Sequence, residues 1–300
     1  MILRKYTKPA TKIDQQIDLL DERGLAISSN AKHLLSTVSL HRLSAYFHPF
    51  KVHNSEQFNP KTSLDQIWAL YTFDRQLRLL ILDTIERVEI ALRTSLSNTL
   101  SCRYSPWWYL DDQVFKTSWS GNTGPKQSLI NETQQICRNK KHNEEIQEYY
   151  KKYDEPPYPP SWIIIEFLSF GQCTSVFRYL RSPQDKSAIC SPFDFHHKIF
   201  ESMLEPLRYT RNLCAHHSRL WDRWFVYKPR AIDELHTIKC KPGTIKEQLA
   251  LLYLLNKRIS PKSAWIKRLH KLFEEQNSFP VHIEKMGFQS DWQNDPFWEL

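Results

Sequence analysis

One stretch of this sequence groups side chains that could act on a phosphodiester. Between Glu205 and Trp221, an arginine, an asparagine and a histidine follow at steps of four residues, as Arg208, Asn212 and His216. At about 100° per residue these side chains would lie on one stripe of a helix, with Arg219 next to it. A cation, an amide and an imidazole would then share one face.

The chemistry that suits this set is cleavage of RNA without a metal ion. The ribose 2′-hydroxyl must lose a proton to attack the adjacent phosphate, and the leaving 5′-oxygen must gain one. Histidine is the side chain whose unperturbed pKa lets it do either near neutrality. Guanidinium groups present planar, always charged donors to the phosphate oxygens on which charge accumulates. Asn212 could orient either the imidazole or the phosphate.

Spacing alone does not single out an arginine and histidine pair. An arginine four to six residues before a histidine is expected about twice by chance in this chain. Arg211 and His216 differ in their surroundings, because Asn212 follows the arginine, a small residue precedes the histidine, and the segment is basic. Arg211 lies about 140° around a helix from His216, so the two converge only if the helix frays or the arginine wraps toward the stripe. Two other pairs match the spacing, Arg42 with His48 and Arg230 with His236.

Positive charge is concentrated in two segments of the chain. Residues 208–230 carry +5 and residues 257–271 carry +6, together more than the net charge of +8 of the whole chain. Such segments suit phosphate contacts, although ordinary solvated helix faces can have the same composition. The residues that we expect to contact RNA are Arg219, Arg223, Lys257, Arg258, Lys262, Lys267, Arg268 and Lys271.

The composition predicts an ordered, all-α protein. Of the 300 residues 41% are hydrophobic, enough for a core, and only 6 are glycine. Long stretches rich in Leu, Ile, Lys, Arg, Glu and Gln favour helix over sheet. Apolar spacing, caps and prolines predict a long helix after residue 63, irregular structure over 105–125, and further helices over 12–24, around 34–47, 128–153, 162–180, about 195–220, 245–257 and 261–274.

Helix ends and buried faces give these predictions local detail. Gly24 should end the first helix in a left-handed turn, and Ser63 should cap the long helix. Ser260 and Pro261 should cap and open the last helix. The segment 162–180 is apolar all round and should be deeply buried.

Charged residues beside the apolar stripe of the long helix should form structural pairs one turn apart. These pairs are Asp74 with Arg78 and Glu89 with Arg93. A direct supporting role of Glu86 or Glu89 in catalysis is the lesser alternative.

The pattern divides the chain into three parts. They are an N-terminal helical region (residues 1–60), a helical core (61–275) with an irregular insert at about 101–160, and an aromatic C-terminal tail (276–300) that should dock on the core. The six cysteines are widely spaced and lack the pairing of a zinc site, so we expect reduced thiols, no metal and no cofactor. No apolar run approaches the ~20 residues that span a bilayer, and we expect a cytoplasmic protein that does not enter a membrane.

Several parts of the chain resemble the Abi abortive-infection family, the AbiD/AbiF-like group of phage-resistance proteins. The stretch from Arg211 to Trp221 is similar to the family's signature. Four more segments resemble family motifs in the family's order, namely Lys8 to Leu25, Arg42 to Phe50, Tyr71 to Arg93 and Met286 to Pro296. An aromatic residue often stands in the family where this chain has His41. The resemblance covers nearly the whole chain.

The resemblance implies a HEPN-like helical domain with additional N- and C-terminal helices, a type of domain found in many metal-independent endoribonucleases. It assigns the catalytic arginine to Arg211, the polar residue after it to Asn212, and the catalytic histidine to His216. In such nucleases two copies of the motif usually meet across a dimer or between two domains. This chain has one credible copy, so the resemblance implies a homodimer with a composite site. It also implies a small RNA as antitoxin or partner.

Other interpretations of the same residues stay open. Arg211 and His216 could cap helix-end carbonyls or pair with acids in the core. The chain could also bind RNA without cleaving it, or act as a protein-interaction module of a defence or toxin–antitoxin system. His217 could be the catalytic histidine in place of His216. Arg208 and Arg219 could support catalysis. The aromatic residues expected to stack on bases are Trp221, Trp224, Tyr227 and Trp265.

Overall fold

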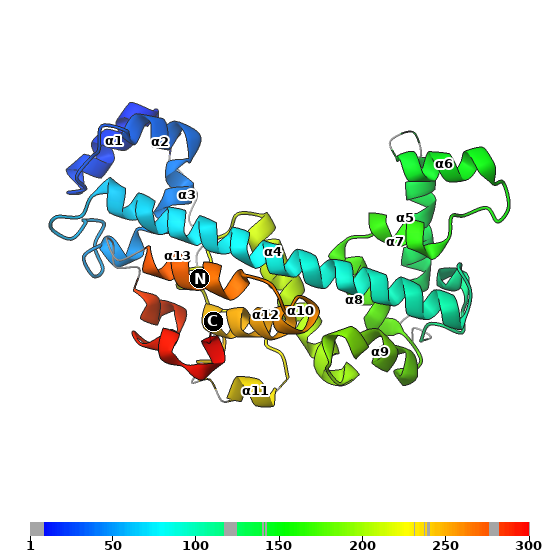
Figure 1. Ribbon diagram of the computed structural model, residues 1–300. Coiled ribbons are helices and arrows are strands. Elements are labelled where there is room, and N and C mark those ends of the chain that lie inside the picture. The colour runs from blue at the N-terminus through cyan, green and yellow to red at the C-terminus, as the bar shows by residue number, and fades with distance from the viewer. Residues whose placement is uncertain are drawn as a thin grey trace, which may run out of the picture. The chain divides into compact units, whose positions relative to one another are not determined.

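The protein is all-α, as its composition predicts. The computed structural model describes residues 9–116, 125–139, 141, 143–230, 232–236, 238, 241–275 and 282–299. Within these residues the regular elements are helices, and strand-like pairing is limited to isolated bridges (Figure 1). In the same residues no helix combines the length and apolar character needed to cross a membrane. The described cysteines are free thiols, and Cys240 lies outside the described residues.

The first of two compact units comprises residues 1–78 together with 271–282. Its elements are α1 (Ile13–Glu22), α2 (Ala31–Thr37), α3 (Leu40–Ser44), a 3-10 turn (His48–Phe50) and the start of α4. Gly24 has a φ of +79°, which confirms the left-handed turn predicted after the first helix. Leu20 of α1, Leu34 of α2 and Leu43 of α3 are buried in the core of this unit.

A buried polar cluster holds α4 to the segment before it in the first unit. Arg78 Nη1 lies 2.5 Å from Asp74 Oδ2, which confirms the predicted pair. The Tyr46 hydroxyl donates to the same carboxylate oxygen at 2.6 Å and accepts from Arg78 Nη1 at 3.2 Å. Burial raises the pKa of Tyr46, so its hydroxyl stays protonated and remains a donor. These three side chains satisfy one another where an unpaired charge would be costly.

The long helix α4 spans Leu64–Arg103 as one element of 40 residues, as predicted. Ser63 Oγ accepts from the backbone N–H of Gln66, and the Gln66 side chain accepts from the Ser63 N–H, a reciprocal cap at the predicted position. Arg93 pairs with Glu89 and also donates to the carbonyl of Ile165. Glu89 therefore takes part in a structural pair.

The second unit comprises residues 79–270 together with 283–300 and includes the rest of α4. Its further helices are α5 (Pro125–Arg138), α6 (Glu144–Lys152), α7 (Ser161–Phe167), α8 (Phe170–Tyr179), α9 (Pro183–Cys190), α10 (His197–Ala215), α11 (Asp233–His236), α12 (Ile245–Ile259) and α13 (Trp265–Glu274), the last of which continues into the first unit.

Several helix predictions in this unit were wrong. The segment 128–153 forms two helices, α5 and α6, rather than one. The segment 162–180 also forms two, because Ser169 and Gln172 make a capping box that starts α8. It is not buried all round either, since Trp162 is 52% exposed. The last helix begins at Trp265 rather than at Pro261, because Ser260 ends α12 and the hydroxyl of Ser263 accepts from the Trp265 N–H.

The helix α10 carries the candidate residues, and its inner face fixes its position. Phe200, Met203, Leu207 and Cys214 are buried on that face, and α10 packs against α8, α9 and α12. The hydroxyl of Thr210 adds a buried bond to the Gln248 side chain on α12 at 3.2 Å. The opposite side of α10 is left to polar residues.

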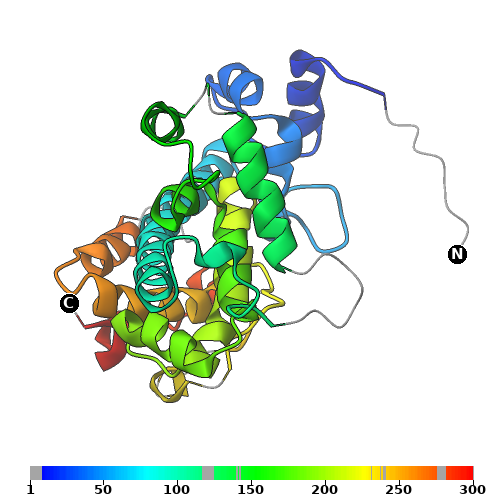
Figure 2. The same ribbon diagram turned by 90° about the vertical axis from the view of Figure 1, so that its right-hand side faces the viewer.

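In the described part of the aromatic C-terminal tail, residues 286–298 pack against α12. Met286, Phe288 and Trp298 are buried, and Trp298 stacks on Tyr253 of α12 with ring centroids 5.8 Å apart. Figure 2 shows the short turns of the tail in red beside the orange α12.

Candidate nucleic-acid interface

The C-terminal end of α10 has a defined backbone geometry. The helix ends at Ala215, not near Leu220 as predicted, and His216 is its C-cap. His217 has a φ of +55°, and its N–H donates to the carbonyl of Cys214 at 3.0 Å. The N–H of Ser218 donates to the carbonyl of Leu213 at 2.8 Å. This pair of bonds is a Schellman motif, in which the left-handed residue is usually glycine.

The structure brings Arg211, Asn212 and His216 to this exposed end of the helix. The His216 N–H donates to the Asn212 carbonyl at 2.9 Å, which places the two residues one turn apart on the same side. Arg211 Nη1 lies 3.5 Å from Asn212 Oδ1, so the arginine side chain does reach toward the stripe. Arg211 and Asn212 are half-buried, and His216 is exposed.

Arg208 is positioned by a carboxylate. Glu205 accepts from Nε and Nη2 of Arg208 and also from Nη2 of Arg178. The bond from Arg208 lowers the pKa of Glu205, and Arg178 lowers it further. Two guanidinium groups are thus fixed on either side of one acid.

Arg219 does not lie on the helical stripe, because the helix ends before it. Its Nη2 donates to the carbonyl of Asp222 at 3.4 Å, and its guanidinium lies 5.9 Å from the ring of Trp221. Arg223 in turn donates to the Arg219 carbonyl at 2.6 Å. Both arginines therefore stabilise the turn after α10. Glu86 is exposed on α4, a different helix, and does not belong to the α10 stripe.

The second basic segment divides into paired arginines and exposed lysines. Arg258 pairs with Glu234 at 2.7 Å and lies 3.6 Å from the ring centroid of Phe195. Arg268 pairs with Asp83 at 2.9 Å. The exposed lysines of the segment are Lys257, Lys262, Lys267 and Lys271.

Two of the four aromatic residues predicted to stack on bases cannot do so. Trp221 and Trp265 are buried, and the Trp265 Nε1 donates to the carbonyl of Leu80. Trp224 and Tyr227 are exposed, at 55% and 41%. The sequence could not separate the two pairs, because tryptophan and tyrosine serve both as core and as surface residues.

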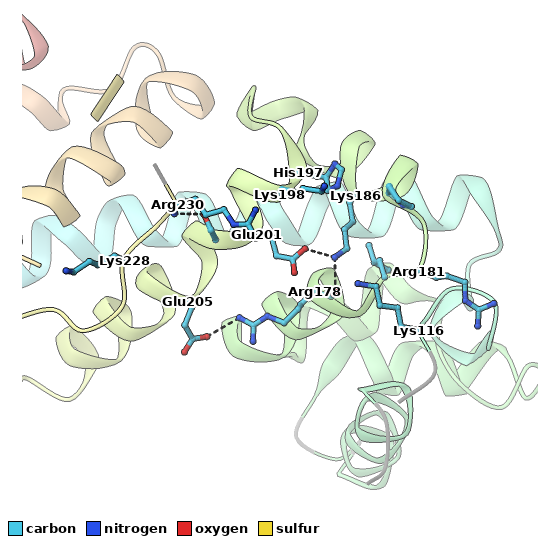
Figure 3. A pocket seen from close by; sticks show the side chains of 13 residues that line it. Lys116, Arg178, Arg181, Lys186, His197, Lys198, Glu201, Glu205, Lys228 and Arg230 are labelled. Carbon is cyan, nitrogen blue, oxygen red and sulfur yellow. Dashed lines mark hydrogen bonds and ion pairs between the residues drawn. The ribbon is translucent and has the colours of Figure 1, made fainter. Parts of the chain in front are cut away.

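A basic cavity of about 580 Å³ lies on the polar side of α10, toward its N-terminal end (Figure 3). The sequence does not reveal this cavity, because its lining residues come from distant segments. His197, Glu201 and Glu205 of α10 line this cavity. Steps of three and four residues continue this row along the helix to Arg208, Asn212 and His216. The cavity and the candidate residues therefore share one face of α10.

Burial and charge perturb two groups in the cavity. Burial lowers the pKa of Lys186, and the positive charge of Lys116 lowers it further, against the opposing effect of Glu201. Burial also lowers the pKa of His197, together with the charges of His196, Lys186 and Lys198. Among the described residues, no group of three or more His, Cys, Asp or Glu side chains could hold a metal ion.

These features define an all-α protein with a polar helix face, ended by an exposed histidine, beside a basic cavity. A family model described as Abi-like protein matches residues 33–222, more than half of the chain, including the Arg211–Trp221 stretch. The chain therefore belongs to the Abi-like protein family, which confirms the resemblance and indicates a role in abortive infection, a form of phage defence. No curated protein and no solved structure matches the chain.

Proposed function

We propose that this protein is a metal-independent endoribonuclease of phage defence, of the HEPN type, and that Arg211, Asn212 and His216 form its site. The observation that carries the proposal is the exposed end of α10, where an arginine reaches an asparagine that lies one turn from a histidine. Membership in an abortive-infection family supports it. A toxin that cuts RNA would stop the growth of an infected cell.

In the proposed reaction, the 2′-oxygen of a ribose attacks the neighbouring phosphorus and loses its proton. The bond from phosphorus to the 5′-oxygen breaks, and that oxygen gains a proton. The products are a 2′,3′-cyclic phosphate and a free 5′-hydroxyl, so atoms and charge balance without a metal ion or cofactor. His216 transfers protons, Arg211 stabilises the charge on the phosphate oxygens, and Asn212 orients the phosphate or the imidazole.

One histidine can serve only one of the two proton transfers at a time. We therefore propose that a second copy of the chain contributes its own Arg211 and His216 to a composite site. The homodimer would bring two imidazoles to one phosphate. A small RNA that covers the same basic surface is the proposed antitoxin.

The test is cleavage of single-stranded RNA by the purified full chain in EDTA. We expect wild-type protein to release fragments with cyclic phosphate ends. His216→Ala should reduce the rate at least about a hundredfold, the loss expected when a general acid–base group is removed. Circular dichroism should show an unchanged helix content.

His48→Ala is the matched control, because His48 is exposed and follows an arginine at a similar spacing but lies outside α10. Its cleavage rate should equal that of the wild type. Intact RNA after long incubation with the folded dimer would refute the nuclease, and undiminished cutting by His216→Ala would refute the proposed site. If the wild type and His216→Ala bind RNA equally well and neither cleaves it, the protein binds RNA without being a nuclease.

A further inference from the structure

The basic cavity beside α10 has a strong excess of positive charge. Seven lysine and arginine side chains and two glutamates line it, an excess of five positive charges. They come from four separate parts of the chain, near residues 116, 178–186, 197–205 and 228–230. Figure 3 shows Arg178, Lys186 and Glu201 close together, with Lys228 and Arg230 to one side of them and Arg181 to the other. Their convergence on one cavity is a property of the fold rather than of any basic run in the sequence.

The two acids of the cavity are already paired, and each pair orders the wall. Lys186 is buried and donates to Glu201 at 2.6 Å and to the carbonyl of Arg178 at 2.8 Å. Glu205 is held between Arg178 and Arg208. Around these pairs, Lys116, Lys198 and Arg230 remain exposed at the cavity. The cavity therefore offers exposed cations around a polar wall of paired side chains, an arrangement that suits phosphate.

The backbone adds to this potential. The first turn of α10 contributes His197 and Lys198 to the wall. The positive end of the dipole of this helix, which is 19 residues long, therefore lies at the cavity. An anion in the cavity would be attracted by the helix end and by the side chains together.

The cavity is aligned with the proposed cleavage site. Glu201 at the cavity and Asn212 at the site share the polar face of α10. Eleven residues separate them, or about 16 Å at 1.5 Å per residue. This distance corresponds to a few nucleotides of a single strand, so one RNA could occupy both places.

An exposed aromatic residue beside the cavity favours a strand over a free phosphate. Lys228 lines the cavity, and its Nζ lies 4.8 Å from the ring centroid of Trp224. The ring is 55% exposed but fixed, because it lies against Gly243, where an added Cβ would come within 2.9 Å of it. Stacking of a base on a fixed aromatic ring, next to cations for the backbone, is the usual way to bind single-stranded nucleic acid.

We propose that the cavity is a second binding subsite for single-stranded RNA, which holds a backbone phosphate a few nucleotides from the cleaved bond while Trp224 stacks on a nearby base. This inference rests on the proposed function for the identity of the ligand. It adds residues that no basic run predicts, chiefly Lys116, Arg178, Lys186 and Lys198. The subsite gives the enzyme affinity for a strand without reading its sequence.

The test measures binding of a fluorescent RNA of about ten nucleotides, within the ~4–16 nucleotides typical of such sites. All proteins carry His216→Ala, so the RNA stays intact. The double variant Lys116→Gln/Lys198→Gln should bind on the order of tenfold more weakly and show a shallower dependence on salt, because two phosphate contacts are lost. Trp224→Ala should weaken binding at least about fivefold.

Lys151→Gln/Lys152→Gln is the control, since it removes the same charge from exposed lysines at the end of α6. It should bind the decamer as the parent does. A dinucleotide should bind all these proteins far more weakly than the decamer binds the parent, because it is too short to reach both places. Adenosine monophosphate should compete only weakly with the decamer.

The outcomes separate this subsite from the proposed nuclease. Equal binding by the two double variants would overturn the subsite, even if the chain with native His216 cuts RNA. If RNA binding depends on the cavity residues but the chain with native His216 does not cut RNA, the nuclease proposal is overturned and the subsite proposal stands. Adenosine monophosphate that binds as tightly as the decamer would make the cavity a nucleotide site and overturn the proposal.

Discussion

At the scale of single residues, the structure separates two adjacent histidines that the sequence could not. His216 has a φ of −88° and is bonded through its backbone to Asn212, one turn earlier. His217 has a φ of +55°, where the chain turns out of the helix. The side chain on the stripe of Asn212 is therefore that of His216, which is why the proposal gives it the proton transfers.

The left-handed backbone of His217 leads to a prediction on stability. Replacing His217 by glycine removes the steric cost of a side chain in this conformation, of about 1–2 kcal/mol, and adds a smaller entropic cost. His217→Gly should therefore raise the free energy of unfolding by about 0.5–1 kcal/mol. Chemical denaturation followed by circular dichroism would measure the change.

The neighbouring histidine supplies the control for that change. His216→Gly should lower the free energy of unfolding, since a negative φ carries no penalty for a side chain. If both variants shift the midpoint in the same direction, the left-handed conformation at His217 does not set the stability of this helix end.

At the scale of helices, the sequence predicted where most apolar stripes lie but not where several of them break. Residues 162–180 contain an apolar run long enough for one helix, so the sequence predicted a single helix there. The structure has two helices, with a break before Phe170. The missed signal was local, a serine followed three residues later by a glutamine, Ser169 and Gln172. In a sequence, a long apolar pattern is easier to recognise than a short capping motif. The folded chain has both, because the apolar residues are packed in two helices and the capping box starts the second one.

The capping box at Ser169 can be tested directly. Ser169→Ala removes the oxygen that accepts from the Gln172 N–H and should cost about 1 kcal/mol in the free energy of unfolding. Asn98→Ala is the control, because Asn98 is exposed within α4, where alanine is the better helix former. Thermal denaturation that ranks the control below Ser169→Ala would contradict the role of this cap.

The candidate residues and the cavity differ in how far the sequence could predict them. Arg211, Asn212 and His216 lie close together in the chain, so local charge and family motifs point to all three, and helical geometry points to Asn212 and His216. The cavity draws Lys116, Lys186 and Lys228 from distant segments, and only tertiary packing brings them together. The sequence also does not show which charged residues pair with each other. Glu205, for example, binds both Arg178 and Arg208 only because packing brings the three together.

At the scale of the whole molecule, the proposed composite site requires two chains. The purified protein should sediment at about twice the mass of one chain, 35.8 kDa. Its specific cleavage activity should fall on dilution as the dimer dissociates. Analytical ultracentrifugation and cleavage assays over the same concentrations would show whether the two losses coincide.

A mixing experiment tests the composite site itself. Wild-type chains mixed with an excess of His216→Ala chains should lose cleavage activity in step with the loss of wild-type dimers, because a mixed dimer holds only one of the two imidazoles of the proposed site. His48→Ala chains added in the same excess are the control and should contribute full activity. Activity that follows the share of wild-type chains, although mixed dimers form, would show that each site is built from one chain.

The close contact between Trp224 and Gly243 has a consequence for how this protein can change in evolution. Gly243 has a φ of +77°, and any side chain there would meet the indole ring. A substitution at 243 would displace the ring, whereas a smaller residue at 224 would relieve the constraint. Positions 224 and 243 should therefore covary among relatives, with glycine kept at 243 wherever an aromatic residue is kept at 224. In lineages that lose the aromatic residue, this clash would be gone, and only the left-handed backbone would still favour glycine at 243.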